Sequence, residues 1–253
     1  MKIVTWNCNG ALRKKTEQID ALNADLLIIQ ECEDPSLSTQ AYRDWAGDYL
    51  WTGESKNKGI GIFPKNGSTV QSLSWAGAFT IEGLASKSAS LTWRSEDLKL
   101  FLPFTLNNKY SILAVWTKGN NDKQAFAYMG QLWKYLQVHR DQLSAPNTLL
   151  IGDLNSNSRW DKEDHWWSHT DVVNELSAIG LNSVYHATTG EDQGSESQST
   201  FFLQRKKEKA YHIDYAFASS DLASVSQVSV GVFEDWIEVS DHMPLNVQIK
   251  SPS

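Results

Sequence analysis

Short apolar runs recur along the whole chain, and most of them have the length and residue types of β-strands. They alternate between apolar and polar positions or are rich in β-branched and aromatic residues, which pack well on a pleated sheet. Strands are predicted at residues 2–6, 26–30, 59–63, 88–93, 110–116, 148–151, 212–218, 226–232 and 245–249. The unbroken apolar run at residues 26–29 is typical of a strand that is buried on both faces.

Three segments between these strands instead show the spacing of helices that bury one face. The first has Thr16 as its predicted N-cap and Ile19 and Leu22 as its apolar positions. The second has Asn121 or Asp122 as the N-cap, followed by the apolar residues Phe126, Met129, Trp133 and Leu136. The third has Thr170 or Asp171 as the N-cap, followed by Val172, Val173, Leu176 and Ile179. Gly180 is expected to end the third helix. Many strands and few helices indicate two packed sheets with helices outside, an α/β layered sandwich.

Length and composition indicate one globular domain over residues 1–253, since the sequence contains neither a linker nor an internal repeat. An apolar content of 41% excludes intrinsic disorder, and two cysteines cannot form a disulfide framework. No apolar run reaches the roughly 20 residues needed to cross a bilayer. The N-terminus also lacks the apolar core of a signal peptide. We therefore expect a cytoplasmic monomer with no membrane partner and no obligate protein partner.

Polar residues end several of the predicted strands, and neighbouring strands would bring them to one rim. These residues are Asn7, Glu31, Asp153 with Asn155, Asp214, and Asp241 with His242. Carboxylate and amide oxygens favour Mg²⁺, with Mn²⁺ as the alternative, and Mg²⁺ needs only one or two protein carboxylates. Such a rim suits hydrolysis of a phosphate ester by an activated water. It does not suit acyl transfer, because the sequence contains no nucleophile elbow or Ser-His-Asp order.

The order of five short motifs resembles that of the endonuclease/exonuclease/phosphatase superfamily, with a pattern closest to exonuclease III-like abasic-site endonucleases. The motifs are Trp6-Asn7-Cys8-Asn9-Gly10, Gln30-Glu31, Gly152-Asp153-Leu154-Asn155, His212-Ile213-Asp214-Tyr215 and Ser240-Asp241-His242-Met243-Pro244-Leu245. The resemblance covers nearly the whole chain. It implies a four-layer αββα sandwich of two mixed β-sheets flanked by helices, with the active site at one edge.

The resemblance also implies which residues hold the metal and the attacking water. Glu31 is the expected principal ligand of Mg²⁺, and Asn7 and Asp241 are expected close to the metal. Asp153 would orient or deprotonate the water. Asn155 would help to hold that water or a phosphate oxygen.

The phosphate contacts implied by the resemblance are less complete. His242 would contact the scissile phosphate, and Asp214 would hold His242 through a hydrogen bond that favours its charged form. The family places a Tyr or a His after the strand that matches residues 111–115, and this chain has neither; Trp116 or Lys118 is the candidate replacement. His212, two residues before Asp214 in a predicted strand, would point to the same face and is a further candidate contact.

Basic and aromatic residues give candidates for binding a nucleic acid. The net charge of −7 argues against coating of a polyanion by bulk charge. Loops expected at the same rim nevertheless carry Arg13, Arg205, Lys206 and Lys207 among other cations, a local positive collar that suits a phosphodiester backbone; ordinary solvated charge is the alternative. The candidates for stacking on a base, of which one or two are expected to be exposed near the site, are Trp116, Trp160, Trp166, Trp167, Phe201 and Phe202.

Together these features predict a Mg²⁺-dependent phosphodiesterase, with DNA as the favoured partner and RNA or a small phosphate ester as alternatives. The leading hypothesis is a DNA endonuclease or exonuclease of repair or processing that uses in-line attack of water. A phosphomonoesterase or phospholipase-type hydrolase, acting on an inositol phosphate or a sphingomyelin-like substrate, is the first alternative. The second is a non-catalytic binding protein, against which the intact Glu31, Asp153, Asp214 and His242 argue.

Overall fold

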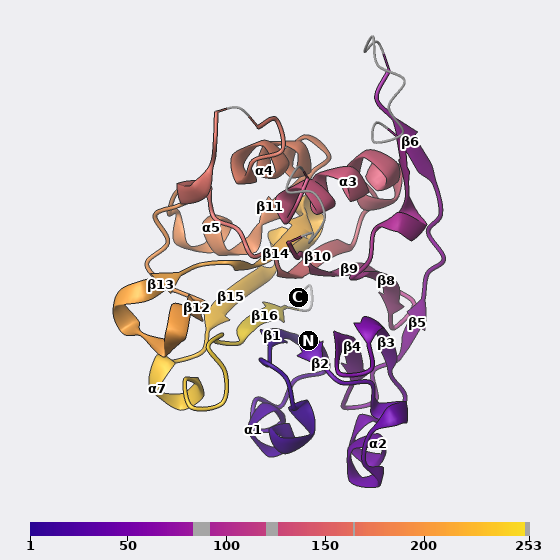
Figure 1. The fold of residues 1–253 in the computed structure, drawn as a ribbon, viewed down its shortest axis with the longest axis vertical. Helices are drawn as coiled ribbons and strands as arrows, with labels where there is room; N and C mark the ends of the chain where they lie inside the picture. Colours follow the sequence, from indigo (N-terminus) through magenta and orange to yellow (C-terminus); the bar gives the residue numbers. More distant parts are fainter. Residues whose placement is uncertain (83–91, 120–125, 164, 251–253) are drawn as a thin grey trace.

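Two six-stranded sheets pack face to face between two outer layers of helices (Figure 1). The structure, a computed structural model, describes residues 1–82, 92–119, 126–163 and 165–250. The first sheet has the order β15 (Ser226–Val230), β16 (Leu245–Ile249), β1 (Lys2–Asn7), β2 (Leu26–Cys32), β4 (Lys58–Pro64) and β3 (Leu50–Ser55). The second has the order β11 (Leu181–Ser183), β14 (Asp214–Ser219), β10 (Thr148–Asp153), β9 (Tyr110–Trp116), β8 (Phe101–Leu106) and β5 (Val70–Ser72).

Each sheet contains one parallel pair of strands, and the other pairs within the two sheets are antiparallel. The parallel pairs are β1 with β2 and β9 with β10. Two short ribbons lie outside the sheets: β6 (Ala78–Thr80) with β7 (Thr92–Arg94), and β12 (Phe201–Phe202) with β13 (Ala210–Tyr211). Two parallel neighbours have their carboxyl ends at the same edge of the sheet. Residues at the carboxyl ends of both parallel pairs can therefore contribute to one site.

Helices cover the outer face of each sheet (Figure 1). The outer helices are α1 (Thr16–Asp20), α2 (Gln40–Ala46) and α7 (Phe233–Trp236) on the first sheet, and α3 (Met129–Leu143) and α4 (His169–Ala178) on the second. Two short helices, α5 (Val184–Thr189) and α6 (Ser220–Ala223), instead add Val184 and Leu222 to the core between the sheets. Figure 1 shows α1 and α2 below the first sheet and α3 and α4 above the second. None of the helices in the described ranges is long and apolar enough to cross a bilayer.

Three layers of apolar side chains hold this arrangement together. Along β2, Leu26 and Ile28 point into the core between the sheets, whereas Leu27 and Ile29 pack with residues of α1 and α2. Beneath α3 and α4, the core is formed by the outer face of the second sheet, which includes Leu150 of β10. This alternation follows from the period of two along a strand. It confirms the predicted four-layer αββα sandwich of two mixed sheets and the strand buried on both faces.

Several predicted boundaries were wrong at the residue level. The third helix begins at His169, because the Ser168 side chain accepts from the backbone N–H of Asp171 and forms a capping box with it. The second helix begins at Met129 after Tyr128; its predicted caps, Asn121 and Asp122, lie outside the described residues, as do residues 88–91 of the predicted strand at 88–93. The strand predicted from residue 212 begins at Asp214.

Strands β3, β5, β8 and β11 were not predicted. Strand β8 contains Pro103, and proline lacks the N–H that a ladder needs, so the pattern did not favour a strand. Strand β3 lies at the edge of its sheet and ends in polar residues, which weakens the apolar signal.

Candidate active site

Two strand ends from different sheets meet at the centre of the site. Asn7 is the last residue of β1 and Asp153 the last of β10, and the Asn7 side-chain amide donates to Asp153 Oδ2 over 2.9 Å. Both side chains are buried. The amide also lies 3.3 Å from Glu31 Oε1, so one NH₂ group links two carboxylates. The Asn7 oxygen accepts from the backbone N–H of Asn9 over 3.0 Å, which holds the amide in this orientation.

Glu31 reaches the site because it is the extra residue of a β-bulge. In the pairing of β2 with β4, Gln30 faces Ile60 and Cys32 faces Gly59, so Glu31 has no partner in the ladder. Its φ of 60° is left-handed, a conformation that a non-glycine residue adopts at a cost. Bulges redirect side chains next to active sites. The carboxylate thereby points toward Asn7, and its other oxygen lies 2.5 Å from Lys58 Nζ.

The turn after β10 holds Asp153 in a fixed orientation. Gly152 has a φ of 148°, and a Cβ there would lie 1.9 Å from the carbonyl oxygen of Val115, so only glycine fits. The backbone N–H of Asn155 donates to Asp153 Oδ1 over 2.8 Å, an Asx-turn. The Asn155 amide donates to Asp153 Oδ2 over 3.0 Å and to the carbonyl of Thr117 over 3.0 Å. Asp153 therefore accepts hydrogen bonds on both oxygens and cannot rotate freely.

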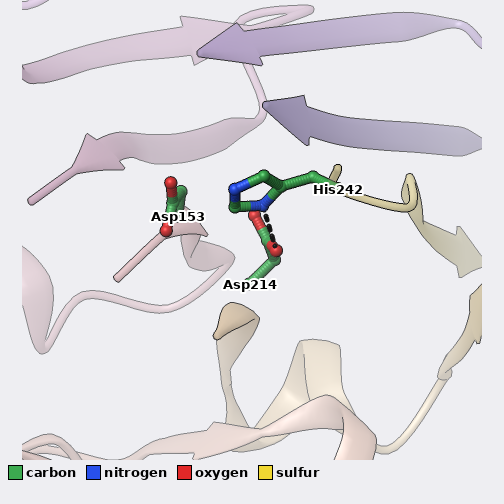
Figure 2. A group of neighbouring side chains, drawn as sticks. All are labelled: Asp153, Asp214 and His242. Atoms are coloured by element: carbon green, nitrogen blue, oxygen red, sulfur yellow. Dashed lines mark hydrogen bonds and ion pairs between the residues drawn. The ribbon is translucent and has the colours of Figure 1, made fainter. Parts of the chain in front are cut away.

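His242 and Asp214 form the second half of the site (Figure 2). His242 Nδ1 lies 2.9 Å from Asp214 Oδ2, and Figure 2 shows the imidazole extending toward Asp153 with the Asp214 carboxylate beside it. The ligating atoms of these three residues lie within 4.8 Å of one another. Asp214 Oδ1 is buried and has no partner among the described residues. A bound cation or a protonated substrate group would satisfy this oxygen.

Backbone contacts fix the position of this pair. The Trp6 indole N–H donates to the carbonyl of His242 over 2.8 Å, and the Ser240 hydroxyl accepts from the backbone N–H of His242 over 3.0 Å. The Thr200 hydroxyl accepts from the backbone N–H groups of Ile213 and Asp214, each over 3.0 Å. Ser240 and Thr200 are the supporting residues that sequence reasoning missed. A supporting hydroxyl leaves no periodic signal in the sequence, even where it stands within a motif, as Ser240 does.

Burial and neighbouring charge set the protonation states of Asp153 and His242. Burial, together with the nearby Asp214 carboxylate, raises the pKa of Asp153 to about 7, while His242 and the Asn7 hydrogen bond act in the opposite direction. Burial lowers the pKa of His242, but the Asp214 and Asp153 carboxylates outweigh it and raise that pKa to about 9. His242 is therefore charged at neutral pH. Its Nδ1–H donates to Asp214, and no described residue accepts from Nε2.

The donor set fits a hard divalent cation. Glu31, Asp153 and the unpartnered oxygen of Asp214 provide carboxylate oxygens at one rim, the ligand type that Mg²⁺ prefers. Asn7 presents its NH₂ group to these carboxylates, so in this geometry it orients ligands. Asp241 directly precedes His242 in the chain, and its charge adds to those that raise the pKa of His242. The structure thus brings six of the seven predicted catalytic and metal residues together at one rim, and the seventh, Asp241, is the neighbour of His242 in the chain.

Two of the residues predicted to contact substrate, Trp116 and His212, have buried rings that pack against other side chains. Trp116 packs in the core between the sheets with Lys118 Nζ over its ring at 5.0 Å, so its ring is not open to a base. The His212 ring contacts Tyr185 and Tyr215, and its Nδ1 lies 2.7 Å from the carbonyl of Gln198. Because His212 precedes β14, the argument that it shares a face with Asp214 does not apply.

Much of the predicted positive collar is paired with acidic residues. Within the collar, Arg13 lies 2.7 Å from Glu33 and Lys207 pairs with Glu234. Lys118, the candidate replacement for the family Tyr or His, is likewise paired, 2.8 Å from Glu54. Arg205 donates to the carbonyl of Glu238 over 2.8 Å, and Lys206 is exposed. Exposed ion pairs contribute little to stability, so a phosphate could replace Glu234 beside Lys207 at small cost, whereas Glu33 beside Arg13 is buried.

Comparisons with known proteins agree with this geometry. The family model described as Endonuclease/Exonuclease/phosphatase family matches residues 4–242. The chain belongs to this family. Members of the endonuclease/exonuclease/phosphatase family are hydrolases that act on phosphoester bonds. No curated protein is similar enough to match the chain.

Solved structures share the family fold at low sequence identity. The 3'-5' exonuclease NExo from Neisseria meningitidis is 20% identical with a TM-score of 0.69, and the alignment covers 99% of this chain and 100% of that one. An AP endonuclease from Archaeoglobus fulgidus is 16% identical with a TM-score of 0.66, again over 99% and 100% of the two chains. NExo from Neisseria has also been solved as a 3' phosphatase bound to a product DNA hairpin, at 19% identity, a TM-score of 0.68 and coverage of 99% and 100%. These likenesses confirm the fold of this family member.

Proposed function

We propose that this family member is a Mg²⁺-dependent phosphodiesterase that cuts DNA as an endonuclease or exonuclease. The observation that carries the proposal is the position of Asp153. This buried carboxylate is held by Asn7 and Asn155 on one side and faces the charged His242–Asp214 pair on the other. A base and a cationic hydrogen-bond donor whose polar atoms lie within 4.8 Å of each other can act on the same water and phosphate, as in-line attack requires. Similar structures described as nucleases, and one bound to DNA, support DNA as the substrate.

The chain's own residues divide the reaction between them. Mg²⁺ held by Glu31, whose carboxylate Asn7 orients, with Asp241 and the buried Oδ1 of Asp214 as further candidate ligands, would supply positive charge to the phosphate oxygens. Asp153 orients the attacking water and takes its proton while the water oxygen bonds to phosphorus. The bond from phosphorus to the leaving oxygen breaks on the opposite side.

His242 and Asn155 act on the phosphate. His242 donates Nε2–H to a non-bridging oxygen, which gains negative charge in the transition state. Asp214 keeps His242 charged and oriented, and the Asn155 amide helps to hold the water or a phosphate oxygen. On DNA this reaction leaves a 5'-phosphate and a 3'-hydroxyl.

A substrate panel with added Mg²⁺ tests the proposal. The panel compares single-stranded DNA, plain duplex, duplex with one abasic site, RNA, an oligonucleotide ending in a 3'-phosphate, and inositol phosphates. Asp153→Asn is the matched control, because it keeps the shape of the side chain but removes the base. We expect Mg²⁺-dependent cleavage of at least one DNA substrate that the variant lacks. Hydrolysis confined to inositol phosphates or to the terminal 3'-phosphate, which are monoesters, or no hydrolysis at all, would contradict the proposal.

A further inference from the structure

An aromatic cavity opens directly beside the candidate active site. It has a volume of about 520 Å³, and its lining includes Asn155, Tyr128, Trp160, Trp167 and His169. The Trp160 side chain is 46% exposed, which is unusual for a tryptophan in a fold whose other large rings are mostly buried. Of the aromatic residues considered from the sequence for stacking, Trp160 is therefore the exposed one that lies near the site.

The cavity is connected to the reacting groups in two ways. Asn155 forms part of its wall, and the Asn155 amide is 3.0 Å from Asp153 Oδ2. Aromatic rings also lead from Trp160 toward the site: Trp160 contacts Tyr211 at 5.0 Å between ring centroids, and Tyr211 is followed by Phe201 at 6.4 Å. The Phe201 ring lies 4.6 Å from His242. Through Asn155 the cavity adjoins the reacting groups, and the ring contacts connect Trp160 to the same side of the site as His242.

The polar part of the cavity wall has little free charge. His169 is buried, which lowers its pKa and keeps it neutral, and its ring nitrogens lie 3.2 Å from Ser156 and from Gln193. The Asp161 carboxylate accepts from the backbone N–H groups of His169 and Thr170, so it is committed to the start of α4. Lys162 lines the edge of the cavity. A second imidazole, His165, stacks on Trp167 at 4.9 Å between ring centroids. Aromatic walls, these two imidazoles and one lysine suit a planar neutral ring attached to a phosphate.

We infer that this cavity binds the base of an unpaired nucleotide next to the cleaved phosphate, with the base stacked on Trp160. The inference rests on the proposed function and adds to it a class of substrate. A base can enter the cavity only when it has left the duplex stack, so single-stranded or frayed DNA is preferred over fully paired DNA.

Base-deletion substrates test this inference. The wild-type cleavage position is first mapped on a short single-stranded oligonucleotide. Oligonucleotides are then made in which one nucleotide near that position lacks its base. Trp160→Ala should raise KM on the complete oligonucleotide about tenfold, as expected for the loss of one base–aromatic stack. On the oligonucleotide that lacks the stacked base, wild type and variant should have the same KM.

Two matched variants separate stacking from other effects. Trp160→Phe keeps a ring and should have a KM close to that of wild type. Trp166→Ala removes a tryptophan that is 51% exposed but lines a different cavity with Phe79, Ile81 and Trp133, and it should leave KM unchanged. On a fully paired duplex, Trp160→Ala should behave like wild type.

The outcomes distinguish this inference from the proposed function. If wild type cleaves DNA but Trp160→Ala raises KM equally with and without the base, or not at all, the base cavity is wrong and the nuclease proposal stands. If wild type cleaves no DNA with Mg²⁺, the nuclease proposal itself fails.

Discussion

Asn7 and Asp153 lie 146 positions apart in the sequence, and the Asn7 amide donates to Asp153 Oδ2 over 2.9 Å. The hydrogen bond joins the end of β1 in the first sheet to the end of β10 in the second. It therefore fixes the distance between the residue expected to bind the metal, Glu31, and the residue expected to activate water. The packing of the two sheets, and not a local motif, therefore sets the distance between the metal-binding and water-activating carboxylates.

Asn7→Ala should disturb both the chemistry and the stability. The Asn7 hydrogen bond lowers the pKa of Asp153, so its loss should move the acidic limb of the pH–rate profile to higher pH. Leaving a buried carboxylate with fewer donors should also cost about 1–3 kcal/mol in the free energy of unfolding. Rates across pH and urea unfolding measure the two effects. Asn246→Ala, on β16 of the same sheet, is the control that should keep the wild-type pH profile.

Glu31→Gln should weaken Mg²⁺ binding more than it slows the reaction at saturating metal. Added Mg²⁺ should then restore part of the lost rate, because the amide oxygen is a poorer ligand but keeps the geometry. Lys58→Met should instead strengthen Mg²⁺ binding, because Lys58 Nζ lies 2.5 Å from the same carboxylate and competes with the cation. Rates against Mg²⁺ concentration, with binding measured by calorimetry, test both variants. A Glu31→Gln enzyme that does not respond to excess Mg²⁺ would show that Glu31 is not the ligand.

His242→Ala and Asp214→Ala should have effects on kcat that do not multiply. Asp214 acts through His242, so removing both should cost about as much as removing His242 alone, on the order of 10²–10⁴ in kcat. A double-mutant cycle on kcat measures the coupling. Two effects that multiply would mean that the 2.9 Å hydrogen bond has no catalytic role.

The buried histidines should make the protein less stable in acid. Burial lowers the pKa values of His169 and His212 below the usual 6.5, so the folded protein keeps both neutral. The unfolded chain takes up these protons below about pH 6.5, so stability is fully present above that pH and falls as pH drops. Each histidine can contribute up to about 1.4 kcal/mol per pH unit in that range. Urea unfolding at about pH 5 and about pH 7.5 measures the decrease, and His212→Gln should reduce it.

The basic residues near the rim should control salt dependence if they bind phosphates. Replacing Arg205, Lys206 and Lys207 by glutamine should raise KM for DNA and flatten the salt dependence by about 0.7–0.9 in log–log slope for each phosphate that is no longer neutralised. Lys109→Gln, just before β9 and at the opposite end of that strand from Trp116, is the control. An unchanged slope in the triple variant would mean that these cations are solvated or stay with their acidic partners, as Lys207 is with Glu234.

Local sequence patterns were sufficient to predict most of the fold and the identity of the site residues. Apolar runs of strand length predicted the central strands of both sheets, because a strand buried on both faces needs continuous apolar residues. Edge strands such as β3, and β8 with Pro103, have weaker patterns and were missed. The cap of α4 was misplaced by a few residues because Ser168, Thr170 and Asp171 can all cap a helix, and only the backbone shows which one does.

The amino-acid sequence by itself determined which chemical groups are present: the carboxylates, the amides and one histidine at strand ends, in the order of the family. Only the tertiary structure decided which of these groups touch. The packing of two sheets brings Asn7 to Asp153, the bulge turns Glu31 inward, and the late start of β14 leaves His212 outside that strand, with its Nδ1 on the carbonyl of Gln198. These outcomes depend on long-range packing and register, which a local pattern does not contain. The same holds for Trp116 and Trp160, since residue type alone cannot tell a buried ring from one that lines a cavity.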